Sequence, residues 1–184
     1  MLQITLLMAN ADGQRYGVVV VHMQDYFFRG HPVGERKDTL LASQKEALDY
    51  CRANRIPVAV MEYCGNEFGP TLADLHAEAR ALPAMGTFRK KDTDCFKSAR
   101  LRRFLESHGV DSLFLMGVYA NDCIIDTSKG GKGYGYSVAS ARDVIGDCPK
   151  CEESAAEWFR SNGSFAESFR ELPPFCKNGA SNYA

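Results

Sequence analysis

The chain has 184 residues, 45% of them hydrophobic and 24% charged, with a formal net charge of −1. This length fits one domain with its own core, and this composition excludes a disordered chain. The charge gives no reason to expect nucleic acid or an anionic membrane as a partner, and no apolar run is long enough to span a bilayer. Because a chain of this size needs no disulfide staples, we interpret the seven cysteines as reduced thiols of a cytoplasmic protein.

The first half of the chain alternates apolar runs with helical patterns. Val18–Val21 is a continuous β-branched run and predicts a buried strand, and a helix is expected over Asp38–Ala53. A second strand is predicted at Pro57–Glu62, and Thr71 is expected to cap the short helix that follows the next loop. Gly86–Lys91 is predicted to be a weak third strand.

The second half continues this alternation. A helix is predicted from Phe96 to His108, and an apolar strand that starts at Leu113 leads through a turn to a helix beginning at Cys123. The elements predicted after it are a strand at 136–141, a helix around 154–159 and a short helix that holds Phe165 and Phe169.

Strands that alternate with helices indicate a three-layer α/β/α sandwich with a mainly parallel central sheet. We expect one domain over residues 1–184, with an N-terminal arm at 1–14 and a loose tail at 174–184. Ligands bind at the carboxyl ends of the strands in such sheets. The residues that end the predicted strands, and are therefore expected to share one rim, are His22, Glu62, Lys90 and Tyr119.

Cys123 is placed where a thiol meets free backbone N–H groups at the start of a helix. These groups and the helix dipole favour the thiolate, and they can stabilise an oxyanion on a carbonyl that the sulfur attacks. A lone cysteine is more often a buried structural residue. The strand–turn–cysteine–helix context favours the nucleophile here.

Three segments carry a resemblance to a known family. Gly117–Cys123, followed by Asp126-Thr127, resembles the nucleophile motif of the isochorismatase-like cysteine hydrolases. Lys90, six residues before Phe96, resembles their lysine segment, and Val18–Phe27 resembles their first strand. The resemblance implies the isochorismatase-like, Rossmann-like topology and a catalytic triad of aspartate, lysine and cysteine.

The resemblance also implies roles for individual residues. Cys123 would be the nucleophile, and Lys90 would hold the thiolate and the aspartate in their charged forms. A non-proline cis peptide is expected at Val118–Tyr119, which would direct the N–H groups of Tyr119 and Cys123 toward the oxyanion. A homo-oligomer is expected, without a cofactor.

The sequence departs from the family at the catalytic aspartate. Aligning Gln24 and Phe27 with the family places His22 at that position. A neutral His22 can accept the proton of Cys123 and return it to a leaving amine. Alternatively, the site is broken and the protein is a silent member that binds a small metabolite or a protein partner. A third possibility is that Asp25 supplies the missing carboxylate.

The remaining site residues follow from their placement near strand ends. Each is equally compatible with a role in the core. The expected substrate-binding residues are Gln24, Tyr26, Phe27, Tyr63, Phe96 and Tyr119.

Family members that hydrolyse nicotinamide carry an Asp-x-His metal site after the second strand. Glu62–Asn66 has no histidine, so no metal is expected. Cys148 and Cys151 have redox-motif spacing, but without a thioredoxin-like context we interpret them as two surface thiols. The function we expect is hydrolysis of a small amide or related C–N bond through a covalent intermediate on Cys123.

Overall fold

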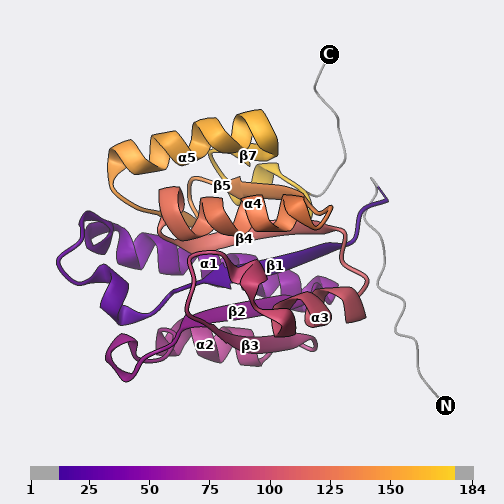
Figure 1. The fold of residues 1–184 in the computed structure, drawn as a ribbon, viewed down its shortest axis with the longest axis horizontal. Coiled ribbons are helices and arrows are strands. Elements are labelled where there is room, and N and C mark those ends of the chain that lie inside the picture. The colour runs from indigo at the N-terminus through magenta and orange to yellow at the C-terminus, as the bar shows by residue number, and fades with distance from the viewer. Residues whose placement is uncertain (1–12, 177–184) are drawn as a thin grey trace.

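The computed structural model describes residues 13–176, so most of the expected arm and tail lies outside the described residues. A seven-stranded sheet has the order β3-β2-β1-β4-β5-β7, with β6 paired to β4. Every strand pairing is parallel, which confirms the predicted sheet (Figure 1). The strands are β1 (Tyr16–Val21), β2 (Val58–Tyr63), β3 (Met85–Lys90), β4 (Ser112–Val118), β5 (Ser137–Ala141), β6 (Ile145–Gly146) and β7 (Ser164–Ala166).

Helices flank this sheet and complete the expected α/β/α arrangement (Figure 1). The α-helices are α1 (Lys37–Asn54), α2 (Ala73–Arg80), α3 (Ala99–Ser107), α4 (Ile125–Gly133) and α5 (Pro149–Asn162). The 3₁₀ turns are η1 (Asp25–Phe28), η2 (Pro32–Arg36), η3 (Asn66–Phe68), η4 (Cys95–Lys97) and η6 (Phe169–Glu171), and η5 (Ala120–Ile124) is a π turn. None of these described helices is both long and apolar enough to cross a membrane.

The valine run of β1 explains why this strand lies inside the sheet. Side chains of a strand alternate between the two faces, so Val18 and Val20 pack with α1 and α2. Val19 and Val21 pack on the opposite face, with α3, α4 and α5. All four valines are fully buried, as expected for a strand that is covered on both sides.

Gly117 allows β4 to approach the end of β1 closely. Its φ is +128°, and a Cβ atom at this position would lie 2.0 Å from the carbonyl oxygen of Val21. A side chain is excluded both by this clash and by the positive φ. The close approach brings the end of β1 next to the turn that carries Cys123.

Several local predictions were wrong. Thr71 does not cap α2, because its hydroxyl donates to Glu62 at 3.0 Å and Leu72 takes the N-cap position. The helix expected from Phe96 begins only after Ser98, whose side chain caps α3. Phe165 lies in β7 rather than in a helix, because Ser140 and its neighbours in β5 pair with that segment.

Two predictions for the C-terminal part of the chain were also wrong. Cys148 and Cys151 form a disulfide at the start of α5 instead of being two thiols. Phe175, within the expected tail, is buried against Phe114 and Phe169.

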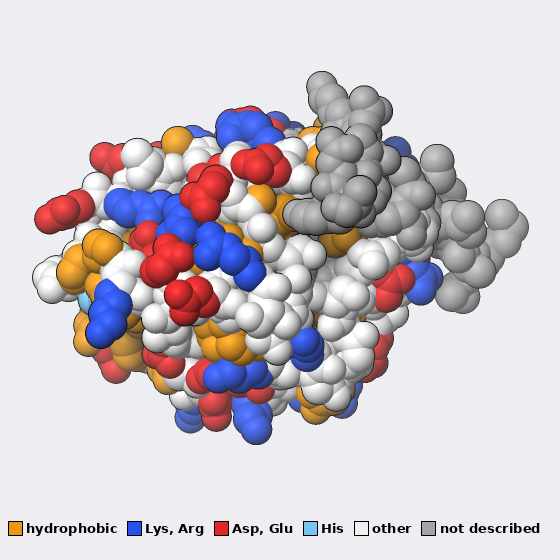
Figure 2. Space-filling model, turned by 90° about the horizontal axis from the view of Figure 1, so that it is seen from above, with side chains coloured by type: hydrophobic (Ala, Val, Ile, Leu, Met, Phe, Trp, Pro, Cys, Tyr) orange, Lys and Arg blue, Asp and Glu red, His pale blue; other side chains and the backbone are white. Residues whose placement is uncertain are grey.

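The surface over α5 carries both signs of charge (Figure 2). Arg142 pairs with Glu153 and Glu167, and Arg160 pairs with the same two carboxylates. Since positive and negative side chains alternate here, this face presents no single-sign field of the kind that attracts a polyanion.

Candidate active site

The ends of four neighbouring strands, in the order β3-β2-β1-β4, form the rim that carries the candidate triad. The register pairs Val21, the last residue of β1, with Met61 of β2 and Gly117 of β4. Lys90 ends β3 and pairs with Tyr63. His22 therefore follows β1 on the same rim that carries Lys90 and the turn after β4, as the sequence predicts.

Cys123 lies in the π turn η5, immediately before α4. The Val118–Tyr119 peptide bond that precedes this turn is cis, as the family resemblance implies. The amides of Asp122 and Ile124 both donate to the carbonyl oxygen of Tyr119, at 3.3 Å and 3.1 Å. These bonds close the turn around the sulfur.

The Cys123 thiol is protonated at neutral pH in this conformation. The side chain is only 4% exposed, and burial raises the pKa of the thiol to about 12. The charge of Lys90 and the backbone N–H of Tyr119 lower this pKa, but they do not outweigh the loss of solvent. The expectation of a stabilised thiolate was therefore wrong for this conformation, and a nucleophilic role for Cys123 would require a proton acceptor.

Lys90 supplies the positive charge of the site. Its side chain is 4% exposed whereas Lys91 is exposed, which fits the alternation of side chains along a strand. The Lys90 ammonium donates to the carbonyl oxygen of Thr93 at 2.5 Å and lies 6.0 Å from the centre of the Tyr63 ring. Thr93 in turn donates to Asp126 in the first turn of α4, at 2.7 Å. The lysine is thus fixed to the helix that follows the nucleophile.

His22 is buried and neutral. Its backbone has a φ of 49°, and neither ring nitrogen has a hydrogen-bond partner within the described chain. Burial, with a further contribution from the positive charge of Lys90, lowers the pKa of His22 to about 2. The ring stacks on Phe27 and meets the edge of Tyr63 at a centroid distance of 5.1 Å. An imidazole in these surroundings stays uncharged at neutral pH.

An aromatic cover, which we define as Tyr26, Phe27, Tyr63, Phe68 and Tyr119, lies over this rim. Phe68 stacks on Phe27 at 5.6 Å and meets the edge of Tyr26 at 4.7 Å. The Tyr119 hydroxyl donates to the carbonyl oxygen of Phe27 at 2.7 Å. Phe68 is missing from the residues predicted from sequence, because it lies in a loop between strands rather than at a strand end.

Three other residues considered from sequence lie elsewhere or have other partners. The Gln24 side-chain oxygen accepts the backbone N–H of Tyr63 at 2.7 Å, and its NH₂ group donates to the carbonyl oxygen of Gly69 at 2.5 Å. Phe96 is 1% exposed and packs against Tyr134 and Tyr136 rather than against the cover.

Asp25 has its carboxylate in ion pairs. It pairs with Arg29 at 2.7 Å and with Lys37, and these two cations hold its pKa below the usual value. Half-exposed and doubly paired, this carboxylate is engaged away from the thiol.

Two carboxylates that the sequence reasoning passed over contact the nucleophile turn. Asp122 precedes Cys123, and the thiol donates to its Oδ2 atom at 3.9 Å. Asp147, next to β6, accepts the backbone N–H of Asn121 at 3.0 Å. His31 lies 3.6 Å from Asp147 and packs on Tyr119 at 4.3 Å. Asp122 could have been identified from the sequence as a site residue, because it directly precedes the motif cysteine.

One cluster in the described chain has the composition of a metal site. Potential ligand atoms of Asp147, Cys148 and Cys151 lie within 4.8 Å of one another. Because the two sulfurs are bonded to each other, they are not thiolate ligands in this state.

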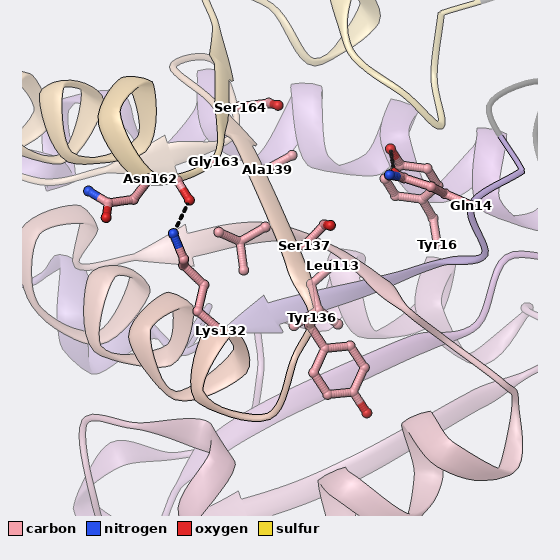
Figure 3. Close-up of a pocket in the computed structure, with 11 residues that line it drawn as sticks. Gln14, Tyr16, Leu113, Lys132, Tyr136, Ser137, Ala139, Asn162, Gly163 and Ser164 are labelled. Carbon is pink, nitrogen blue, oxygen red and sulfur yellow. Dashed lines mark hydrogen bonds between the residues drawn. The ribbon is translucent and has the colours of Figure 1, made fainter.

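One cavity is remote from Cys123. It has a volume of about 340 Å³ and lies near the amino ends of β4 and β5, between Leu113, Ser137 and Gly163 (Figure 3). Lys132 spans it and donates to the carbonyl oxygen of Asn162 (Figure 3). A second cavity, of about 250 Å³, lies beside Tyr63 and Arg89 at the rim. The first cavity is at the wrong end of the sheet to serve the nucleophile.

Comparison with known proteins decides the family. The sequence model of the isochorismatase domain matches residues 16–168. The chain belongs to the isochorismatase family. Its fold has the family's mainly parallel sheet and flanking helices, and the match spans all the residues of the rim. A search of curated proteins finds no match to this isochorismatase-family chain.

Solved structures show the same fold at low sequence identity. The nicotinamidase of Staphylococcus aureus superposes with a TM-score of 0.72 at 17% identity, over 83% of this chain and 99% of that one. The N-carbamoylsarcosine amidase of Thermoplasma acidophilum gives a TM-score of 0.72 at 15% identity, over 87% and 99%. A ribonuclease of Caenorhabditis elegans gives 0.74 at 17% identity, over 84% and 77%.

Proposed function

We propose that this isochorismatase-family protein is a cysteine hydrolase that cleaves a small amide or related C–N bond through a covalent intermediate on Cys123. The observation that carries this proposal is the shared site: buried Lys90 acts electrostatically on both the Cys123 thiol and the His22 ring. Burying an ammonium group costs free energy unless it pairs with a neighbouring anion. The thiolate, formed when Cys123 loses its proton, is that anion.

The reaction begins when the thiol gives up its proton and the sulfur attacks the carbonyl carbon. The N–H groups of Tyr119 and Cys123 are proposed to stabilise the oxyanion, and Lys90 stabilises negative charge on the sulfur. The leaving amine takes a proton, and water then hydrolyses the thioester. His22, at the position of the family aspartate, is one candidate for the group that carries these protons.

Two relatives suggest which substrates to test first. One is a nicotinamidase and another is an N-carbamoylsarcosine amidase, so both have small substrates with a C–N bond. The aromatic cover offers flat apolar surfaces to such a molecule. We propose a small-molecule substrate that lies between the cover and Cys123.

The test is ammonia release from a panel that includes nicotinamide and N-carbamoylsarcosine. Wild-type protein should hydrolyse at least one member and Cys123→Ala none, with thermal unfolding confirming that the variant folds. Mass spectrometry of a quenched reaction should show an acyl adduct on the peptide that contains Cys123. Equal turnover by wild type and Cys123→Ala would refute the proposal.

A silent binding protein is the second candidate. The raised pKa of the Cys123 thiol and the missing aspartate at His22 favour it. In that case, no panel member is hydrolysed although ligands still raise the melting temperature.

Assembly and location extend the same proposal. A structural relative from Escherichia coli is an octameric hydrolase. We propose a homo-oligomer of the cytoplasm, and sedimentation of the full chain tests its order.

A further inference from the structure

In the proposed reaction, no residue has yet been assigned to remove the proton from the Cys123 thiol. The Cys123 thiol is protonated, so a group in contact with it must take the proton before the sulfur attacks. The same group must return the proton to the leaving nitrogen. Three carboxylates and one imidazole lie near enough to the nucleophile turn to be compared.

Three of these groups are poorly suited to this step. The His22 ring nitrogens have no hydrogen-bond partner in the described chain, and a conjugate acid with a pKa of about 2 holds a proton too weakly. Asp126 accepts the Thr93 hydroxyl and pairs with Lys129 at 3.5 Å. Asp147 has one oxygen on the Asn121 amide and the other on the Cys148 amide.

Asp122 differs from these groups in its contacts. The Cys123 thiol donates to its Oδ2 atom, and no ion pair between residues 13 and 176 involves this carboxylate. Its side chain is exposed, whereas Cys123 is buried, so it can exchange protons with solvent. Although the residue as a whole is exposed, desolvation of its carboxyl group raises its pKa; the charge of Asp126 adds to this rise, Lys90 opposes it and Asp147 adds further. A raised pKa moves a carboxylate toward the range in which it can both accept and release protons.

We propose that Asp122, rather than a residue at the end of β1, is the acid–base catalyst of this site, an assignment that rests on the proposed hydrolase function. The S–H proton of Cys123 passes to Asp122 as the sulfur forms a bond to the carbonyl carbon. Asp122 then protonates the nitrogen, the C–N bond breaks, and the amine leaves behind a thioester.

The second half of the reaction restores the enzyme. The water oxygen attacks the thioester carbon while the water gives a proton to the Asp122 carboxylate. The C–S bond breaks, the acid is released, and the proton returns to the Cys123 sulfur. The sum is one amide and one water converted to one acid and one amine. The 3.9 Å separation suits a resting site that tightens when substrate binds.

The experiment measures alkylation of Cys123 by iodoacetamide, read by peptide mass spectrometry from about pH 5 to about pH 9. If Asp122 takes the proton, the wild-type rate levels off once the carboxylate is ionised. In Asp122→Asn the plateau should vanish, and the rate should climb about tenfold per pH unit. At about pH 7 the alkylation rate of the variant should be lower than that of wild type by a factor of about ten or more. Asp122→Glu should recover part of the plateau.

Glu106→Gln is the matched control, because it removes an exposed carboxylate from the last turn of α3, near Tyr136 at the amino end of β5 and so away from the rim. It should reproduce the wild-type profile. Labelling of Asp122→Asn as fast as wild type or faster at about pH 7 would overturn the proposal, because the carboxylate would then take no proton from the thiol. A plateau lost in His22→Asn and kept in Asp122→Asn would assign the step to His22. Because no substrate is used, this outcome is independent of whether any amide in the panel is hydrolysed.

Discussion

The imidazole of His22 lies nearly parallel to the ring of Phe27, with centroids 4.9 Å apart and planes inclined by 16°. This stacking places a titratable ring inside an aromatic layer, where its positive form loses hydration. The end of β1, where the family resemblance implies a charged aspartate, is therefore occupied by a neutral group.

Protonation of His22 should destabilise the fold in acid. Its pKa is 6.5 in the unfolded chain and about 2 in the folded one, so the unfolded state binds more protons between these values. The free energy of unfolding is therefore unaffected by His22 above pH 6.5, the unfolded pKa, and it falls as the pH drops below that value. Between pH 6.5 and pH 5 this should cost about 2 kcal/mol. In urea unfolding, the free energy of unfolding should fall more steeply with decreasing pH in wild type than in His22→Asn; equal slopes would contradict this account.

Replacement of Lys90 should make the thiol harder to ionise. The ammonium lowers the pKa of both Cys123 and Asp122, so Lys90→Met should move the alkylation profile of Cys123 to higher pH by about one unit. Lys91→Met is the control, since Lys91 is exposed on the other face of the strand. A shift of equal size in both variants would show that the effect is not local to the site.

A carboxylate at position 22 should compensate for the loss of Asp122. Aspartate tolerates the positive φ of His22, and beside Lys90 it would form an attractive pair. Adding His22→Asp to Asp122→Asn should therefore restore rapid alkylation of Cys123 near neutral pH. The measurement is the same labelling profile, compared with that of Asp122→Asn alone. No recovery in a folded double variant would show that position 22 cannot reach the proton.

Gly117→Ala should be strongly destabilising. The added Cβ would lie 2.0 Å from the Val21 carbonyl oxygen, at a φ of +128°. We expect a loss of about 3 kcal/mol or more in the free energy of unfolding. Gly133→Ala is the matched control because nothing lies within 4 Å of its Cβ position, and it should change stability by less than about 1 kcal/mol. Similar unfolding midpoints for the two variants would be inconsistent with this account.

Much of the rim was predictable because it depends on strand ends. The valine run and the apolar run from Leu113 identify two buried strands, and parallel pairing places the residues after them together. His22, Lys90 and Cys123 could be brought together on this basis alone. The cis peptide at Val118–Tyr119 was predicted from the family resemblance instead.

The protonation state of the site was not predictable in this way. The pKa of Cys123 depends on its burial in a core cluster whose other members include residues of β1, β2, η4 and α3, so it depends on tertiary packing and not on the motif itself. The contact between Asp122 and the sulfur depends on the π turn, whose geometry has no simple sequence period. β7 escaped prediction because a three-residue strand forms only through its pairing with β5.

The Asp147 carboxylate joins two segments that are translated at different times. It accepts the Asn121 amide of the nucleophile turn, and it lies just before the first turn of α5. A nascent chain that has passed the cysteine motif but not residue 147 lacks this support. The turn that carries Cys123 thus completes its hydrogen bonds only after a later part of the chain has emerged and docked, when most of the domain already surrounds it.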